Sequence, residues 1–351
     1  MNNYEVVEQL SNAFGPSGFE DEVTGIIRGL VEPFVDDVRL DALGNLLVTR
    51  SGNSDRTIML DAHMDEIGFM ISYIEDNGFL RFSAIGGWDA RIIPSHRMTI
   101  QSDNGSDIHG VVGTLPPHLL SAEDRSKPHK IEDLFLDIGA ANADEVSELG
   151  IRIGSPAVIH YPFQQLQGDM VTGKALDDRG GCAVLIATLA ALADETPEMT
   201  VVGAFTVREE VGLIGAGTAA FQIQPDLALV LEATIGADMP GVSKQRQVTR
   251  LGGGPAITVA DGSQIVKPEL VKFLTDTADE LEIPWHYKLP PFGGTDGGSI
   301  QRSRGGVRSA SVSIPCRYIH SPFSVMRMSD FEHTVELTTA FARRGHGLLP
   351  A

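Results

Sequence analysis

The sequence predicts an α/β fold with a mainly parallel-containing sheet flanked by helices, and with an inserted β-barrel domain. Two patterns lead to this prediction. From Gly168 onward, apolar runs typical of strands alternate with segments of helical periodicity, as they do in folds with a largely parallel sheet. Between Gly68 and about Phe163, short β-like runs follow one another and helical periodicity is scarce.

The first 67 residues predict two short helices, a hairpin and one strand. Apolar residues recur at helical spacing over 7–14 and over 23–30, and the Gly-Pro-Ser-Gly segment at 15–18 separates the two stretches. The segment VRLDALGNLLVTR has the pattern of a hairpin, and the apolar run TIMLDA after it ends on His63. This strand belongs with the later ones, so the α/β domain is discontinuous.

The inserted segment contains short β-like runs separated by Gly, Asn, Asp and Pro. The runs are GFMISYI, GFLRFSAI, RMTIQS, HGVVGTL, LFLDIGA and PAVIHY. A polar loop around 116–130 interrupts them. We therefore expect an α/β domain made of residues 1–67 and 164–351 and a barrel-like domain made of residues 68–163.

The C-terminal half predicts strands and helices in alternation. The expected strands are TVVGAFTV, LALVLEA, ITVA and ASVSI, and the expected helices cover about 178–193, 216–221, 268–281 and 329–344. Strands that alternate with helices in this way form parallel sheets covered by helices.

The composition predicts a globular cytoplasmic protein that binds neither nucleic acid nor membranes. Among 351 residues, 42% are hydrophobic, and 47 Asp and Glu against 27 Lys and Arg give a formal net charge of −20. Such a charge repels phosphate backbones and anionic membrane surfaces. The N-terminal MNNYEVVEQL lacks a basic stretch followed by an apolar core, and the apolar run 182–193 is too short to span a bilayer. Cys182 and Cys316 are too few for a disulfide framework.

Ionisable residues stand where the predicted strands end or where a helix begins. They are His63 after TIMLDA, Asp177 in KALDDRGG, Glu209 and Glu210 after TVVGAFTV, Glu232 in LALVLEA, and His320 after ASVSIPCRYI. In open α/β sheets, ligands bind beyond the carboxyl ends of the strands. We therefore expect this set to meet at one edge of the sheet.

Imidazole and carboxylate groups without thiolates suit Zn²⁺ or a similar divalent ion at a catalytic site. Five ligands suggest two ions, which Asp177 could bridge. His63 and Glu232 would complete one site, and Glu210 and His320 the other. Two-metal hydrolases use such a pair to hold a nucleophilic water.

A carboxylate that does not hold metal must move the proton of that water, and Glu209 is the candidate general base. Asp65 lies two residues beyond His63 and could hold the other ring nitrogen of this histidine. Each residue alone also has an ordinary interpretation. Asp177 or Asp178 could cap a helix, and Glu209-Glu210 could be a polar turn. Their joint location at strand ends favours a site.

Several motifs resemble those of the glutamyl/deblocking aminopeptidase family, which includes the tetrahedral aminopeptidases. The motifs are HMDEIGF, KALDDRGG, REEVGLIGA, EATIGADMPG, PFGGTDGG and YIHSP, together with PPHLLSAEDRSKPHKIEDLFLDIGA in the inserted segment. The resemblance covers essentially the whole chain. It implies a zinc-peptidase-like catalytic sheet, a β-barrel dimerisation domain, and assembly of dimers into a hollow tetrahedral dodecamer.

The resemblance also implies a role for each site residue. The metal ligands would be His63, Asp177, Glu210, Glu232 and His320, with Asp177 bridging two ions of Zn or Co. Glu209 would be the general base and Asp65 the carboxylate that orients His63. Two positions depart from the family pattern, since Glu232 stands where Asp is common and Arg208 where Gln is common. The implied activity is removal of N-terminal residues from short peptides.

Other functions stay open from the sequence. Paired carboxylates also serve glycoside hydrolases, and some relatives carry the label endoglucanase, but a glycosidase has no need of two histidines among its carboxylates. An N-deacylase or carboxypeptidase could use the same kind of sheet, and a non-catalytic binding or assembly protein is the third alternative. The sequence does not predict which N-terminal residue is preferred, which metal is native, or whether the chain forms a dimer or a dodecamer.

Overall fold

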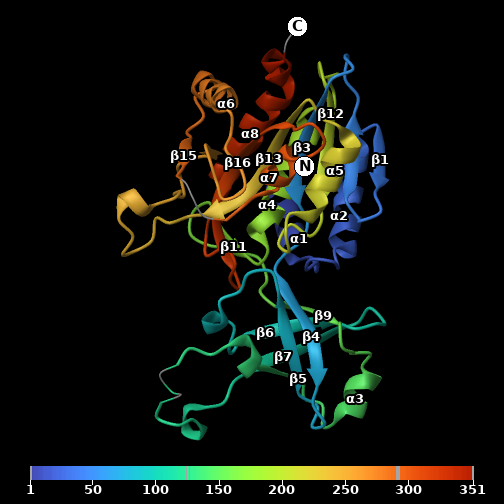
Figure 1. Cartoon of the computed structure of the whole chain (residues 1–351), viewed down its shortest axis with the longest axis vertical. Helices are drawn as coiled ribbons and strands as arrows, with labels where there is room; N and C mark the ends of the chain where they lie inside the picture. Colours follow the sequence, from blue (N-terminus) through green and yellow to red (C-terminus); the bar gives the residue numbers. More distant parts are fainter. Residues whose placement is uncertain (1, 124, 126, 290–292, 350–351) are drawn as a thin grey trace.

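The computed structural model describes residues 2–123, 125, 127–289 and 293–349. Asp124 and Ser126 of the inserted-segment motif and Pro291 and Phe292 of PFGGTDGG therefore lie outside the described residues. In the described part of the chain, no helix is long and apolar enough to cross a membrane. Figure 1 shows an upper body of helices and strands and a lower body of strands, joined at a narrow waist.

The upper body contains a large mixed sheet with the order β1-β2-β12-β3-β13-β16-β17-β11-β10, and β14 and β15 extend from β16. The strands are β1 Asp37–Leu40, β2 Leu46–Arg50, β3 Thr57–His63, β10 Gln164–Gln165, β11 Met170–Gly173, β12 Thr200–Thr206, β13 Leu227–Ile235, β14 Ala256–Thr258, β15 His286–Lys288, β16 Arg308–Arg317 and β17 Ser324–Arg327. The central pairs β12–β3, β3–β13 and β13–β16 are parallel. The outer pairs β1–β2 and β16–β17 are antiparallel. The predicted fold class is confirmed.

Helices cover both faces of this sheet because its central strands are apolar on both sides. In β3, Ile58, Leu60 and Ala62 pack in the larger core, whereas Met59 packs in a smaller core on the other face. This alternation is the two-residue period of a strand. The larger core includes α1 Asn3–Asn12, α2 Asp21–Val31, α4 Leu176–Ala191, α6 Pro268–Glu280 and α8 Met328–Arg344. The smaller core includes α5 Ile214–Ile223 and α7 Asp296–Gln301.

The lower body is a closed barrel with the strand order β4-β5-β8-β7-β6-β9. Its strands are β4 Gly68–Ile74, β5 Leu80–Ile85, β6 Arg97–Gln101, β7 Asp107–Gly113, β8 Phe135–Asp137 and β9 Pro156–Ile159, and α3 Ala143–Glu148 lies outside it. Alternate residues such as Phe69 and Ile71 fill the interior. All six predicted β-like runs are strands of this barrel. The boundaries at residues 68 and 163 stay a prediction.

A buried ionic network fastens the N-terminal segment to α4. The Arg179 guanidinium donates to the backbone carbonyls of Met64, Leu10 and Gly15 and lies 3.6 Å from Glu66 Oε1. The Lys174 ammonium donates to the same Glu66 oxygen at 2.7 Å. The Arg179 and Glu66 side chains are 0% and 4% exposed, so each of these charges is compensated within the network.

We expect Arg179→Met to lower the free energy of unfolding by about 3–5 kcal/mol, because it leaves buried carbonyls without a donor and takes a cation from Glu66. Urea unfolding followed by circular dichroism measures this change. The control is Arg28→Met, since Arg28 and its partner Glu32 are 50% and 52% exposed. The control is expected to cost less than about 1 kcal/mol. A similar small loss in Arg179→Met would refute the importance of the network.

Candidate active site

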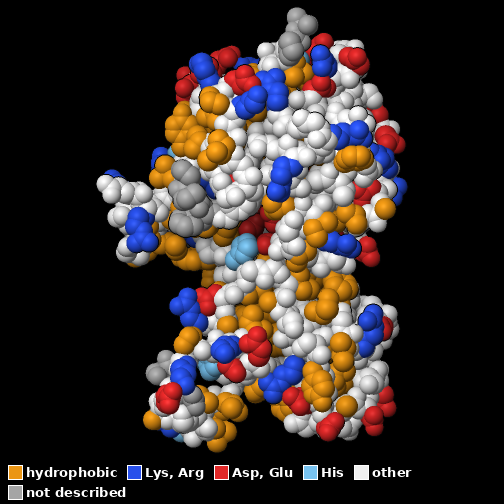
Figure 2. Space-filling model, viewed as in Figure 1, with side chains coloured by type: hydrophobic (Ala, Val, Ile, Leu, Met, Phe, Trp, Pro, Cys, Tyr) orange, Lys and Arg blue, Asp and Glu red, His pale blue; other side chains and the backbone are white. Residues whose placement is uncertain are grey.

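The predicted site residues meet at the carboxyl ends of the central parallel strands. His63 is the last residue of β3 and pairs in register with Thr206, the last residue of β12. Glu209 and Glu210 follow β12, Glu232 lies near the end of β13, and His320 lies in the turn between β16 and β17. Figure 2 shows red acidic side chains and a pale blue histidine in the hollow at the waist, between the two bodies.

Asp177 lies between the two histidines and presents a different oxygen to each. Asp177 Oδ1 is 3.5 Å from His63 Nε2, and Asp177 Oδ2 is 3.7 Å from His320 Nε2. Glu232 Oε1 lies 3.3 Å from His63 Nε2, and Glu210 Oε2 lies 3.4 Å from His320 Nε2. By these contacts, Asp177 and Glu232 lie beside His63, and Asp177 and Glu210 lie beside His320. Ligand atoms of His63, Asp177 and Glu210 also lie within 4.8 Å of one another.

The donor set fits divalent metal ions. Four ligand atoms about 2.0–2.1 Å from a tetrahedral Zn²⁺ lie about 3.3 Å from one another, which is close to the distances between these imidazole and carboxylate atoms. The Glu232 Oε2 atom is buried and has no hydrogen-bond partner among the described residues. Among the residues that the structure describes, no Lys or Arg forms an ion pair with these carboxylates. The site could therefore hold one divalent ion beside each histidine.

The sequence allowed either Asp177 or Asp178 to cap a helix, and in the structure Asp178 has this role. Asp178 Oδ1 accepts a hydrogen bond from Gly181 N at 3.0 Å, as the cap of the regular part of α4. A Cβ at Gly181 would lie 2.4 Å from the Asp178 carboxylate, so this position requires glycine. The other oxygen, Oδ2, is buried without a partner in the described chain, and Asp178 groups by distance with His63 and Glu232.

Asp65 connects β3 to the loop that carries Glu209 and Glu210. Its carboxylate is 0% exposed and accepts hydrogen bonds from the backbone N–H groups of Glu209, at 3.0 Å, and Glu210, at 3.2 Å. It also accepts a hydrogen bond from Ser17 Oγ at 2.6 Å. The closest Asp65 atom to His63 Nδ1 is the backbone carbonyl oxygen at 3.0 Å, whereas the carboxylate is 3.4 Å away. Asp65 thus contacts both His63 and the two glutamates.

The barrel contributes a contact to the site. The Gly87 carbonyl, in the loop after β5, lies 3.1 Å from His320 Nδ1. A Cβ at Gly87 would lie 3.0 Å from the same nitrogen, so only glycine leaves His320 this room. His320 and the nearby Tyr318 have left-handed backbone conformations, with φ of 56° and 64°. Such conformations persist in non-glycine residues only where the surroundings hold them.

Burial shifts the pKa values of the acidic groups. Burial raises the pKa of Glu209 well above the usual range, although the nearby positive charge of His63 acts to lower it. Burial also raises the pKa of Glu232 to about 7. Burial alone would lower the pKa of His63, but hydrogen bonds to Asp177 and Asp65 raise it well above the usual range. Like charges at such short distances therefore need protons or cations to offset them.

Two further buried carboxyl groups lie beneath the site and were not singled out from the sequence. Asp61 of β3 and Asp296 of α7 are 0% and 1% exposed, and Thr206 Oγ1 donates to Asp296 Oδ2 at 3.0 Å. Burial and their mutual repulsion raise the pKa of Asp61 well above the usual range, and burial raises that of Asp296 to about 6. The signal was present, because Asp61 alternates with His63 along TIMLDAH and Asp296 lies in the GGTDGG segment.

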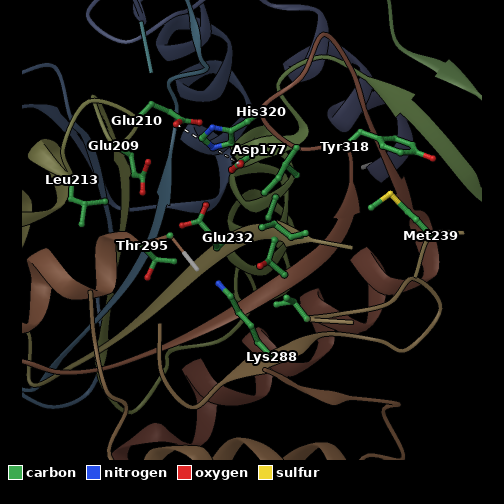
Figure 3. A pocket seen from close by; sticks show the side chains of 17 residues that line it. Asp177, Glu209, Glu210, Leu213, Glu232, Met239, Lys288, Thr295, Tyr318 and His320 are labelled. Atoms are coloured by element: carbon green, nitrogen blue, oxygen red, sulfur yellow. Dashed lines mark ion pairs between the residues drawn. The ribbon is translucent and has the colours of Figure 1, made fainter. Parts of the chain in front are cut away.

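A cavity of about 610 Å³ opens beside these residues. Its wall includes Asp177, Glu209, Glu210, Leu213, Glu232, Ile235, Met239, Val248, Lys288, Thr295, Tyr318 and His320. In Figure 3, the carboxylates and His320 lie on one side, and Met239 and Tyr318 lie apart from them. The cavity therefore offers charged groups beside apolar walls, as sites for small polar substrates do.

The chain matches the M42 glutamyl aminopeptidase family over residues 44–337. FrvX of Escherichia coli (strain K12) is 36% identical over 97% of this chain and 94% of the relative. The lysyl aminopeptidase of Pyrococcus furiosus is 31% identical over 97% of this chain and 96% of the relative, and the glutamyl aminopeptidase of Lactococcus lactis is 31% identical over 94% and 93%.

Solved structures of aminopeptidases are similar to this chain over 97% of its length. The TET aminopeptidase of a marine sediment Thaumarchaeota archaeon has a TM-score of 0.95 at 38% identity, over 97% of this chain and 96% of that one. The TET1 peptidase of Pyrococcus horikoshii, described as assembling into a tetrahedron or a large octahedral shell, has a TM-score of 0.87 at 33% identity, over 97% and 99%. With this similarity and this site, the chain belongs to the M42 glutamyl aminopeptidase family and is a peptide hydrolase.

Proposed function

We propose that this chain removes N-terminal residues from short peptides at a centre of two divalent metal ions. The observation that carries the proposal is Asp177, whose two oxygens face different histidines at 3.5 and 3.7 Å. His63, Asp177 and Glu232 would hold one ion, and Asp177, Glu210 and His320 the other. Zinc or cobalt is the expected metal, since the donors are imidazole and carboxylate groups.

Two ions in these positions would polarise the scissile carbonyl and lower the pKa of the attacking water. The protein must then move protons, and Glu209 is the proposed general base. Its Oε2 atom lies 4.0 Å from His63 Nε2, and its side chain lines the cavity. Glu209 would accept the proton of the water at this carboxylate and return it to the departing amine. A pKa raised by burial suits both steps.

Asp65 is the proposed positioning residue for this chemistry. Its carboxylate accepts hydrogen bonds from the backbone of Glu209 and Glu210, and its backbone carbonyl faces His63 Nδ1. Asp65 would therefore keep the proposed base, Glu209, at a fixed position relative to the proposed ligands Glu210 and His63. At position 232 the family pattern commonly has Asp. Glu232 would supply the same carboxylate group on a side chain that is one methylene longer.

We also propose that the chain self-associates through the barrel domain of residues 68–163, and that dimers form a tetrahedral dodecamer. The described assembly of the Pyrococcus horikoshii peptidase supports this proposal. So do apolar side chains exposed on the barrel domain, such as Leu119 at 72% and Leu115 at 51%. Cytoplasmic location stays a prediction from the sequence.

The family disfavours the alternatives of a glycoside hydrolase and of a non-catalytic binding protein. An N-deacylase or carboxypeptidase would need a different arrangement of substrate around the same kind of centre. The family does not decide the preferred N-terminal residue, because relatives named for lysyl and for glutamyl activity are both 31% identical to this chain.

Glu209→Gln is expected to lower kcat on aminoacyl p-nitroanilides by about 10²–10⁴-fold, because an amide cannot accept the proton. The assay uses chelated enzyme reconstituted with Zn²⁺, Co²⁺ or Mn²⁺, and metal content is measured on the same samples. Metal content should stay at the wild-type level. The exposed Glu148→Gln is the matched control and should keep full activity. Robust turnover by Glu209→Gln would remove this residue from the role of base.

Chelation is expected to leave a protein whose thermal stability falls as pH rises from 5.5 to 7.5. The pKa of Glu232 is about 7 in the folded chain and about 4.5 without the fold, so between these values the native state holds a proton that the unfolded chain releases. The native state therefore loses stability as pH rises. Thermal unfolding should show a weaker pH dependence in metal-free Glu232→Gln, whereas Glu148→Gln should follow wild type. Equal slopes in all three proteins would contradict the assignment.

A further inference from the structure

A second pocket lies next to the active-site cavity, where the barrel meets the sheet. This junction pocket has a volume of about 600 Å³. One wall is formed by Asp89, Ile92, Pro94 and His96, which lie between β5 and β6 of the barrel. The other wall is the turn of residues 318–323, which connects β16 to β17. The function proposed above does not use this pocket.

The junction pocket and the active-site cavity have three lining residues in common. Tyr318, Ile319 and His320 line both spaces. Figure 3 shows His320 beside Asp177, and it shows the Tyr318 ring lying apart from the carboxylates. His320 is also a proposed metal ligand, whose Nε2 atom lies 3.7 Å from Asp177 Oδ2. A molecule that is bound at the metal centre therefore needs to cross only this turn to enter the junction pocket.

The exposure of the proposed ligands indicates the direction in which a peptide leaves the metal centre. The His63 and Glu232 side chains are 2% and 7% exposed, whereas the His320 side chain is 41% exposed. An aminopeptidase binds the first residue of a peptide, so the chain beyond the first peptide bond must extend toward the open side of the site. His320 lies on that side, and it is also part of the wall of the junction pocket.

We propose that the junction pocket binds an apolar side chain that follows the scissile bond, at the second or third residue of the peptide. This inference rests on the aminopeptidase function proposed above. Ile92, Pro94 and Phe323 would pack on that side chain and remove it from water. The pocket has the size of a small-ligand site. An extended chain advances by about 3.3–3.6 Å per residue, so the second and third residues are the ones that stay near the metal centre.

Hydrogen bonds hold both walls of the junction pocket. In the barrel, the Asp89 carboxylate accepts hydrogen bonds from the backbone N–H of Arg91, at 3.0 Å, and from its guanidinium group, at 2.6 Å. In the turn, Ser321 Oγ lies within hydrogen-bond distance of the carbonyl oxygens of Tyr318 and Phe323, at 2.7 and 2.6 Å. A pocket whose walls are already in place loses little conformational freedom when a peptide binds.

The test measures kcat/KM of metal-loaded enzyme on the tripeptides Leu-Gly-Gly, Leu-Leu-Gly and Leu-Gly-Leu, as loss of the intact tripeptide. The first residue is the same in all three peptides, so differences between them report only on the positions that follow the scissile bond. We expect wild type to favour at least one of the two peptides with a second Leu over Leu-Gly-Gly, by roughly 10-fold, the effect of an apolar group in a matching pocket.

Ile92→Asp should lower this preference by roughly 5-fold or more, because an apolar side chain in the pocket would take the new carboxylate out of water. It should also raise kcat/KM, relative to wild type, for the peptide with Lys at the favoured position, which a loss of folding could not do. Ile92→Leu keeps the wall apolar and should keep the preference. The matched control is Ile153→Asp, which replaces another exposed isoleucine of the barrel domain, and its ratios should equal those of wild type.

The outcomes separate the two proposals. If metal-loaded wild type cleaves none of the tripeptides, the proposed aminopeptidase function fails. If it cleaves all three at equal rates, only the role of the junction pocket fails. An equal loss on all peptides in Ile92→Asp would also overturn that role. Light scattering on the same samples gives the oligomeric mass. A changed mass of Ile92→Asp with unchanged peptide ratios would make the pocket a contact between copies of this chain and would overturn the proposal.

Discussion

The parallel register of β12, β3 and β13 brings several acidic side chains into one buried space. The other features of the site follow from the need to offset their negative charges. Asp177, Glu209, Glu210 and Glu232 meet around His63, whose side chain is 2% exposed. Carboxylates removed from water repel one another strongly unless cations or protons are present. Two proposed metal ions would offset the ligands, and raised pKa values would keep protons on buried groups that hold no metal. In this view, the carboxylates can stay close together only when metal ions or protons are bound.

The sheet and the barrel meet at the candidate site, and both contribute residues that contact it. The chain leaves the α/β domain directly after His63 and Asp65, and the barrel returns a carbonyl, that of Gly87, to His320 Nδ1 at 3.1 Å. An imidazole held through one nitrogen presents the other to its ligand in a fixed direction. A movement of the barrel relative to the sheet would therefore change the contact that holds His320, one of the proposed metal ligands.

Much of the fold and the site was predictable because the relevant signals are local. Strand periodicity in TIMLDAH and an apolar run before Glu209 place these residues at strand ends, and parallel sheets bring such ends together. Other features depend on contacts between distant segments. Examples are the hydrogen bonds from Glu209 and Glu210 to Asp65 and the contact between Gly87 and His320. The helix α7 was missed because its glycines resemble a loop, and Asp296 was missed with it.

The central claim is that Asp177 joins two metal ions. It is tested most directly by diffraction data collected at the absorption edge of the bound metal, on crystals of the enzyme loaded with Zn²⁺ or Co²⁺. The account predicts two anomalous peaks, each beside a different carboxylate oxygen of Asp177, with His63 and Glu232 around one peak and Glu210 and His320 around the other. A single peak, or a second peak that does not contact Asp177, would contradict it.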